Sequence, residues 1–343
     1  MLERTGNAVS DSSERGTNER DKRTKDAMSE AGPGRTVTVR VPAKVNLQLS
    51  VGPPAPDGYH DLVNVFHAVS LYDEVVATEL PGAEPGIVTV AVEDAGGGLP
   101  VDGVPLDGTN LAARAATALA EHVGVDRAVH LTLRKRIPVA AGMAGGSADG
   151  AAALVACDAL WDTAVPRADL DALAAGLGAD VPFALLGGTA MGLGRGDRLS
   201  PVLARGQFHW VLAFAEGGLS TPAVYRECDR LRGDDVGPPA VNEALMAALR
   251  GGDARALGRA LGNDLQAAAV SLRPQLRLTL EAGEEHGVLG AVVSGSGPTC
   301  AFLVASLEAG LDLAVGLTAM GLCRDVKRAV GPVPGARLVP AAS

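Results

Sequence analysis

A stretch rich in glycine and alanine, set between a strand pattern and a helix pattern, constrains the fold of this 343-residue chain most. It reads Lys135-Arg-Ile-Pro-Val-Ala-Ala-Gly-Met-Ala-Gly-Gly-Ser-Ala-Asp-Gly-Ala151, and the helix pattern continues to about residue 161. Backbone N–H groups of the glycines and of Ser147 could converge on an anion at the positive end of this helix. The stretch is neither a P-loop nor a G-x-G-x-x-G fingerprint. Phosphate binding and a plain turn with Ser147 as N-cap therefore both stay open.

Two other segments combine polar residues or glycine with apolar strand patterns. The run Lys44-Val-Asn-Leu-Gln-Leu-Ser-Val51 alternates strictly, which predicts a strand with Lys44 and Asn46 on one polar face. Lys44 is either a solvated edge-strand lysine or a functional cation. The segment Ser294-Gly-Ser-Gly-Pro-Thr299 lies between two apolar runs, so it is either a strand connection or an anion-binding nest.

The order of helix and strand patterns predicts an α+β chain of two domains. Residues 1–34 hold 6 basic and 7 acidic residues with few large apolar side chains, so we expect a disordered tail there. The domains would span 35–195 and 196–335. Strands are predicted at 36–41, 44–51, 87–92, 128–133, 209–215, 288–293 and 300–304, and helices from 110, from 147, and at 167–177, 221–232, 241–250, 253–269 and 273–286.

Charge and cysteine content argue against several classes of protein. The net charge of −10 disfavours a nucleic-acid or membrane-surface binder. Four cysteines without C-x-x-C or zinc spacing indicate reduced thiols and no thiolate metal site. The uncharged run 287–307 could cross a bilayer by length, but its polar glycine-rich centre argues for two strands and a loop. With no apolar signal sequence in the first residues, we expect a soluble cytoplasmic protein.

Taken in order, the motifs resemble those of the GHMP small-molecule kinase superfamily. The matching segments are Pro42-Ala-Lys-Val-Asn-Leu-Gln-Leu49, Asp57-Gly-Tyr-His-Asp-Leu62, Leu71-Tyr-Asp73, Ile137 to Ser147, Gly178-Ala-Asp-Val-Pro-Phe183 and Ser294 to Thr299. The resemblance covers residues from about 36 to 335. It implies a two-domain fold, with a ribosomal S5 domain 2-like N-terminal domain and a ferredoxin-like α/β C-terminal domain.

The resemblance also implies an activity. The segments Asp57-Gly-Tyr-His60 and Gly178-Ala-Asp-Val-Pro-Phe183 point to the member that uses ATP and Mg²⁺ to phosphorylate the 2-hydroxyl of a cytidine diphosphate derivative of methylerythritol, in the non-mevalonate route to isoprenoid precursors. The partners would be the small-molecule substrate and ATP, without nucleic acid or membrane, and the resemblance leaves the oligomeric state open. The alternatives are another GHMP kinase, of the homoserine or mevalonate type, and a nucleotide-binding protein without catalysis.

Residue roles follow from the same resemblance. Asp180 would take the proton from the hydroxyl, and Lys44 would lie beside it; from local sequence alone Asp180 is a turn or cap residue. The substrate-binding residues would be Asn46, Tyr59, His60, Thr221 and Tyr225, with the two tyrosines stacking on the cytosine. The segment Ser294–Thr299, called the third motif below, would supply Ser294, Gly295, Ser296 and Gly297. The ATP loop would comprise Pro138, Val139, Ala140, Ala141, Gly142, Met143, Ala144, Gly145, Gly146, Ser147 and Ala148, with Ser147 near the metal.

The sequence departs from the family pattern in the ATP loop. Ala140, Ala141 and Ala144 stand where relatives usually have more glycine. Alanine restricts the backbone but still permits close approach of a phosphate, so the departure concerns nucleotide affinity rather than reaction class.

Overall fold

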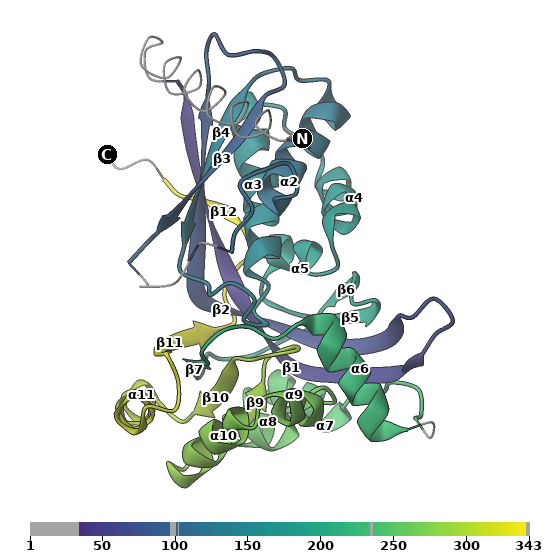
Figure 1. The fold of residues 1–343 in the computed structure, drawn as a ribbon, viewed down its shortest axis with the longest axis vertical. Helices are drawn as coiled ribbons and strands as arrows, with labels where there is room; N and C mark the ends of the chain where they lie inside the picture. The colour runs from purple at the N-terminus through teal and green to yellow at the C-terminus, as the bar shows by residue number, and fades with distance from the viewer. Residues whose placement is uncertain (1–33, 97–100, 102, 234–235, 341–343) are drawn as a thin grey trace, which may run out of the picture.

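The computed structural model describes residues 34–96, 101, 103–233 and 236–340, and Figure 1 shows two lobes stacked along the long axis. The expected disordered tail, residues 1–34, lies outside this range except for Gly34. The upper lobe contains β1 (Thr36–Pro54), β2 (His60–Glu79), β3 (Val88–Asp94), α2 (Leu111–Val123), β4 (Val129–Lys135), α3 (Gly145–Trp161), α4 (Arg167–Leu177), α5 (Val181–Leu186), β5 (Thr189–Gly194) and β6 (Arg198–Pro201). The lower lobe contains β7 (Phe208–Phe214), α6 (Thr221–Arg232), α7 (Glu243–Gly251), α8 (Ala254–Ala260), β8 (Gly262–Asn263), α9 (Gln266–Leu272), α10 (Gln275–Glu285), β9 (Gly290–Val293), β10 (Cys300–Val304), α11 (Leu307–Met320) and β11 (Asp325–Gly331), before β12 (Arg337–Leu338) returns to the upper sheet.

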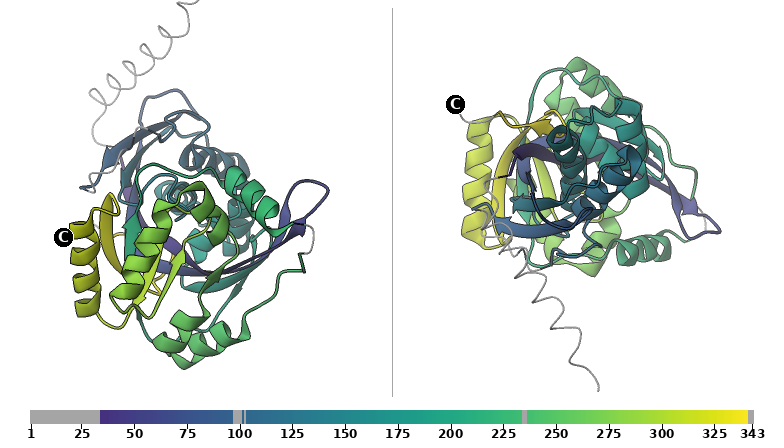
Figure 2. Two further views of the ribbon diagram at one scale, coloured as in Figure 1. Left: turned by 60° about the horizontal axis from the view of Figure 1, so that its bottom comes forward. Right: turned by 90° about the horizontal axis from the view of Figure 1, so that it is seen from above.

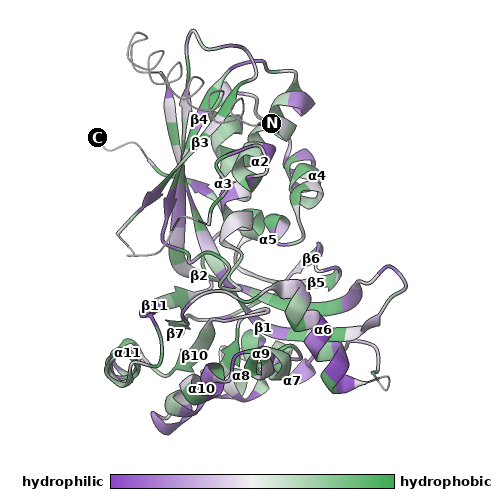
Figure 3. Cartoon of the chain, viewed as in Figure 1, coloured by the Kyte–Doolittle hydropathy of each residue, from purple (hydrophilic) through white to green (hydrophobic). Residues whose placement is uncertain are grey.

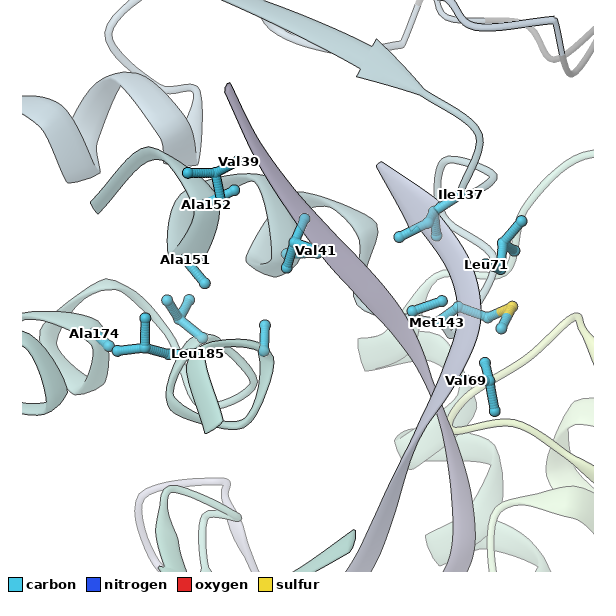
Figure 4. Packing of buried hydrophobic residues seen from close by; sticks show 14 of the residues in the cluster. Val39, Val41, Val69, Leu71, Ile137, Met143, Ala151, Ala152, Ala174 and Leu185 are labelled. Carbon is cyan, nitrogen blue, oxygen red and sulfur yellow. The ribbon is translucent and has the colours of Figure 1, made fainter. Parts of the chain in front are cut away.

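The upper lobe is a sheet covered on one face by helices. The strands follow the order β12-β1-β2-β4-β3, with β5 and β6 continuing from β2 and β8 pairing with β1. Small residues let the helices approach closely, since Ala151 and Ala152 of α3 lie beside Val39 and Val41 of β1 in the core (Figure 4). Figure 3 shows α3 as largely apolar. Close packing of small residues explains how a chain with few aromatic side chains still forms a well-packed core.

The lower lobe holds an antiparallel sheet in the order β11-β7-β10-β9. In chain order these strands are the fourth, first, third and second, which is the order of a ferredoxin-like sheet. The predicted two-domain α+β fold is therefore confirmed. Phe302 and Leu317 belong to the core between this sheet and its helices.

One long hairpin runs through both lobes (Figures 1 and 2). β1 and β2 pair antiparallel from Thr36 opposite Thr78 to Pro54 opposite His60. Leu47 lies in a large core cluster that extends from the upper lobe to β7 and β10, whereas Leu49 and Val51 lie in a second cluster within the lower lobe. The domain boundary at residue 195 falls in the turn between the paired strands β5 and β6, and it stays a prediction.

Several local predictions were wrong. The helix expected at 253–269 is two helices separated by β8, because Asn263 donates hydrogen bonds from its amide nitrogen to the carbonyl oxygens of Val293 and Gly295, both at 2.7 Å. The strands expected at 36–41 and 44–51 form one strand, with an irregularity after Pro42. The strands β2 and β11 and the helices α5 and α11 were not predicted. Within the described ranges, no helix combines the length and apolar character needed to cross a membrane.

Candidate active site

Two adjoining cavities lie between the lobes. The lysine cavity, about 500 Å³, is lined by residues of four predicted motifs: Lys44, Asn46, Ala140, Ala141, Gly142, Ala144, Gly145, Gly146, Ser147, Asp180, Gly295, Ser296 and Gly297. The aromatic cavity, about 830 Å³, is lined by Tyr59, His60, Thr221 and Tyr225. Thr221 and Tyr225 line both. The structure therefore brings together residues that lie up to 253 positions apart in the sequence, from Lys44 to Gly297.

Lys44 is buried, and its amino group is surrounded by two hydrogen-bond acceptors and a carboxylate. Its Nζ donates to Asn46 Oδ1 at 2.7 Å and to the Gly142 carbonyl at 2.8 Å, and lies 4.0 Å from Asp180 Oδ2. Asn46 is held in turn by donating from Nδ2 to Asn64 Oδ1 at 2.8 Å. Burial lowers the pKa of Lys44, and the Asp180 carboxylate opposes that shift. The alternative of a solvated edge-strand lysine is wrong, because Lys44 is only 6% exposed.

Asp180 occupies the N-cap position of α5 but does not act as a cap. Its backbone is in the αR region and its side chain makes no capping hydrogen bond. The carboxylate is one-third exposed and faces the lysine cavity. A capping role would require a carboxylate oxygen to accept a hydrogen bond from the local backbone. No such bond is made, so both oxygens are free to interact with groups in the cavity.

The glycine-rich loop presents the start of α3 to the same cavity. α3 begins at Gly145, so Ser147 is its third residue and the N-cap alternative for Ser147 is wrong. The N-cap is Ala144, at φ 59°, and no side chain caps this end of the helix. The uncapped first turn leaves the positive end of the helix dipole directed at the cavity. Ala140 is also left-handed, at φ 52°, so two alanines adopt conformations that favour glycine.

Not all of the predicted ATP loop lines the lysine cavity. Met143 and Ala148 are buried in the upper core, and Figure 4 shows Met143 packed there. Pro138 and Val139 line a neighbouring cavity of about 280 Å³ that also includes Gly145 and Gly146. The loop therefore separates two spaces, one next to Lys44 and one behind it.

The third motif is a hairpin connection that packs on the glycine loop. β9 and β10 pair antiparallel, and the Ser294 hydroxyl donates to the Gly142 carbonyl at 3.1 Å. Gly142 has φ 75°, and a Cβ there would lie 2.2 Å from the Ser294 carbonyl oxygen, so only glycine fits. The N–H groups of Ser294 and Gly297 bond within the turn. An anion-binding role stays a prediction, and within this turn it would fall to Gly295 and Ser296.

The two predicted stacking residues, Tyr59 and Tyr225, both line the aromatic cavity. Tyr59 is 56% exposed, and the Arg195 guanidinium lies over its ring at 3.9 Å. Tyr225 on α6 packs against His60, with ring centroids 5.1 Å apart, and burial raises its pKa. His60 Nε2 is 2.9 Å from Asp229 Oδ1. Tyr225 thus packs against the lower core and also lines both cavities.

A buried ionic cluster behind the glycine loop was missed in the sequence. Lys135 Nζ donates to Asp149 Oδ2 at 2.5 Å and also to the Asp73 carboxylate. Asp73 also accepts a hydrogen bond from the Ile137 N–H at 2.8 Å. Burial works against the charged lysine, but the two carboxylates raise the pKa of Lys135. The cluster ties β2, β4 and α3 together where the loop begins. Asp73 in the Leu-Tyr-Asp segment was the available signal.

Comparison with known proteins agrees with this arrangement. The family models described as GHMP kinases N terminal domain and GHMP kinases C terminal match residues 110–188 and 245–321. Fold and site thus define a small-molecule kinase of the GHMP class. The 4-diphosphocytidyl-2-C-methyl-D-erythritol kinase of Thermobifida fusca is 58% identical over 306 residues, covering 89% of this chain and 98% of that protein. This chain therefore belongs to the family of 4-diphosphocytidyl-2-C-methyl-D-erythritol kinases.

Solved structures separate the shared fold from the particular family. A crystal structure of 4-(cytidine 5'-diphospho)-2C-methyl-D-erythritol kinase has a TM-score of 0.68 and 35% identity, covering 85% of this chain and 98% of that one. A homoserine kinase from Cytophaga hutchinsonii has a TM-score of 0.69 at only 19% identity, covering 89% and 97%. The second likeness shows the fold alone.

Proposed function

We propose that this chain transfers the γ-phosphoryl group of ATP to the 2-hydroxyl of 4-diphosphocytidyl-2-C-methyl-D-erythritol. The observation that carries the proposal is the Lys44–Asp180 pair, 4.0 Å apart, between the glycine loop and the aromatic cavity. Phosphoryl transfer requires the acceptor hydroxyl, a base and the terminal phosphate of ATP to meet at one place. The two adjoining cavities provide such a place.

Asp180 would act as the base. Its carboxylate would accept the 2-hydroxyl proton while the hydroxyl oxygen forms a bond to the γ-phosphorus and the bond from that phosphorus to the bridging oxygen breaks, releasing ADP. Lys44 would favour the negative charge on the attacking oxygen. It is held for this role by Asn46 and the Gly142 carbonyl.

The glycine loop would bind the ATP phosphates. The uncapped first turn of α3 offers N–H groups and a positive dipole, and Gly142 lets the loop pack on the third motif. The described residues contain no group of three or more His, Cys, Asp or Glu side chains that could hold a metal by themselves. The hydroxyl of Ser147, which lines the lysine cavity, fits Mg²⁺ that is carried mainly by phosphates. When bound, Mg²⁺ would neutralise charge on the phosphate oxygens.

The aromatic cavity would bind the cytidine. Tyr59 and Tyr225 both line this cavity and offer ring surfaces on which the cytosine would stack. When His60 donates from Nε2 to Asp229, its Nδ1 can accept a hydrogen bond from the cytosine amino group. Thr221, bonded to Ser296 at 2.8 Å, would join the cytidine site to the third motif. The four free cysteines support a reducing compartment, and we place the reaction in the cytoplasm.

A panel of acceptors tests the proposal. ADP release is measured with the cytidylyl substrate, homoserine, mevalonate and galactose, and the position of phosphate is assigned by ³¹P NMR. We expect turnover only with the cytidylyl compound. Turnover of another alcohol without turnover of this one would overturn the substrate assignment, and Tyr59→Ala would then leave the rate unchanged.

A further inference from the structure

A single cation lines the junction between the two cavities. Five residues line both of them, namely Leu62, Ala179, Arg195, Thr221 and Tyr225. Among these described residues Arg195 alone carries a charge. Resting on the proposed function, we infer that Arg195 binds the diphosphate of the substrate and so sets its preference for a cytidine diphosphate.

The order of groups in the substrate carries the first step. The diphosphate lies covalently between the cytidine and the methylerythritol. With the base in the aromatic cavity and the reacting hydroxyl beside Asp180, the diphosphate has to cross the wall that the cavities share. Lys44 does not meet this need, because its Nζ already bonds Asn46 and Gly142 inside the lysine cavity.

The surrounding charge makes a cation necessary there. Asp197 and Asp229 line the aromatic cavity and Asp180 lines the lysine cavity, in a chain of net charge −10. A diphosphate entering among these carboxylates would be repelled unless a cation stood at the junction. A guanidinium suits the position, since its planar fork donates two parallel hydrogen bonds to phosphate oxygens.

Arg195 is held near this position by weak contacts that the substrate could replace. Its Nη2 lies 2.8 Å from Asp57 Oδ2, and both side chains are 55% exposed. An exposed pair of this kind contributes little stability, so exchanging Asp57 for a diphosphate costs little. The guanidinium also lies over the Tyr59 ring at 3.9 Å, next to the surface proposed for the base.

The backbone beneath Arg195 is fixed. Arg195 sits in the β5–β6 turn between Gly194 at φ 70° and Gly196 at φ 92°, and the Gly196 N–H donates to the Leu193 carbonyl at 3.1 Å. A Cβ on Gly192 would lie 2.6 Å from the Gly196 carbonyl oxygen, so the turn folds back tightly on its own strand. The side chain can therefore change partners while its Cα stays in place.

Calorimetric binding of CDP and of cytidine tests the inference, with Arg195→Met and the wild type compared. We expect the Kd for CDP to rise roughly 10- to 100-fold, the value of a lost charge-assisted contact, and the Kd for cytidine to change less than about threefold. Arg195→Lys should recover part of the loss. Arg198→Met is the control, because Arg198 starts β6 on the same hairpin and lines neither cavity.

The outcomes separate the two proposals. Equal losses for CDP and cytidine would mean that Arg195 only supports Tyr59, and a change in the KM for ATP instead would place it on the nucleotide; either result overturns the inference. Loss of CDP binding in Arg226→Met but not in Arg195→Met would also overturn it. Failure of the wild type to phosphorylate the cytidylyl compound would refute the proposed function, while the CDP-to-cytidine ratio would still report on Arg195.

Discussion

Replacing Asp180 by asparagine tests the central pair most directly. Asparagine keeps the shape of the side chain and its position at the start of α5, but it cannot accept a proton. The carboxylate makes no capping hydrogen bond, so α5 loses no local support. The expected effect is therefore on chemistry rather than on folding.

The size of the effect follows from the lost base. General-base catalysis contributes about 10²- to 10⁴-fold, equivalent to about 3 to 5 kcal/mol in the barrier. The 4.0 Å separation from Lys44 corresponds to an attraction of about 4 kcal/mol at an effective dielectric constant of 20, before solvent screening of the partly exposed carboxylate. Losing this attraction lowers the pKa of the buried Lys44 further. We expect kcat to fall about 10³-fold.

Steady-state kinetics and ATP titration check this prediction. The KM for the acceptor and the Kd for ATP should stay within about threefold, because the interaction lost is made in the transition state. Asp171→Asn is the control, since it removes the same charge from an exposed ion pair on α4. Parallel loss of ATP affinity and rate in Asp180→Asn would refute the reasoning and make Asp180 a structural residue.

Three further changes test the supporting structure by urea unfolding. Gly142→Ala should lower the free energy of unfolding by about 3 kcal/mol, because Gly142 has a left-handed φ and an added Cβ would clash with the third motif; it should also raise the KM for ATP. Gly176→Ala is the control, since the space around its Cβ is open. Equal free energies of unfolding for the two variants would contradict the argument. Burial lowers the pKa of His67 to about 3, so on acidification the unfolded chain is protonated at this position before the folded one. The free energy of unfolding should therefore fall by about 2 kcal/mol from pH 7 to pH 5. His67→Gln should lack this loss. If the free energy of unfolding depended on pH equally in the wild type and in His67→Gln, His67 would not be the cause. Lys135→Met leaves two buried carboxylates without their cation and should cost about 3 to 5 kcal/mol, whereas a loss below 1 kcal/mol would show that the cluster is dispensable.

Helices with clear ends could be predicted from the sequence. α4 and α6 begin and end where expected, because proline lies at or near each start and Gly178 and Gly233 follow each end. β2 was not predicted, because its sequence carries no clear strand pattern. Its central residues 63–69 are buried without interruption, so the run lacks the alternation that marks a half-buried strand.

The site was predictable only in part. Lys44 and Asn46 share a strand face, and the glycine loop has its own composition, so both could be singled out locally. Asp180 has no local signal, and its role rests on the family motif. Arg195 and the Lys135 cluster depend on contacts between distant segments, such as Lys135 with Asp73, 62 residues away. No local pattern encodes such contacts.

The long β1–β2 hairpin has a mechanical consequence. The same two strands belong to both lobes, and their pairing shifts register on both sides of Lys44, at Pro42/Ala43 and at Asn46/Gln48. A hinge motion between the lobes would bend the hairpin at these irregularities. Lys44 lies between the two irregularities, so such bending would change its distance from Asp180. Adjustment to substrate that keeps the Lys44–Asp180 spacing therefore has to take place in the segments at the cavity edges, the β1–β2 and β5–β6 turns.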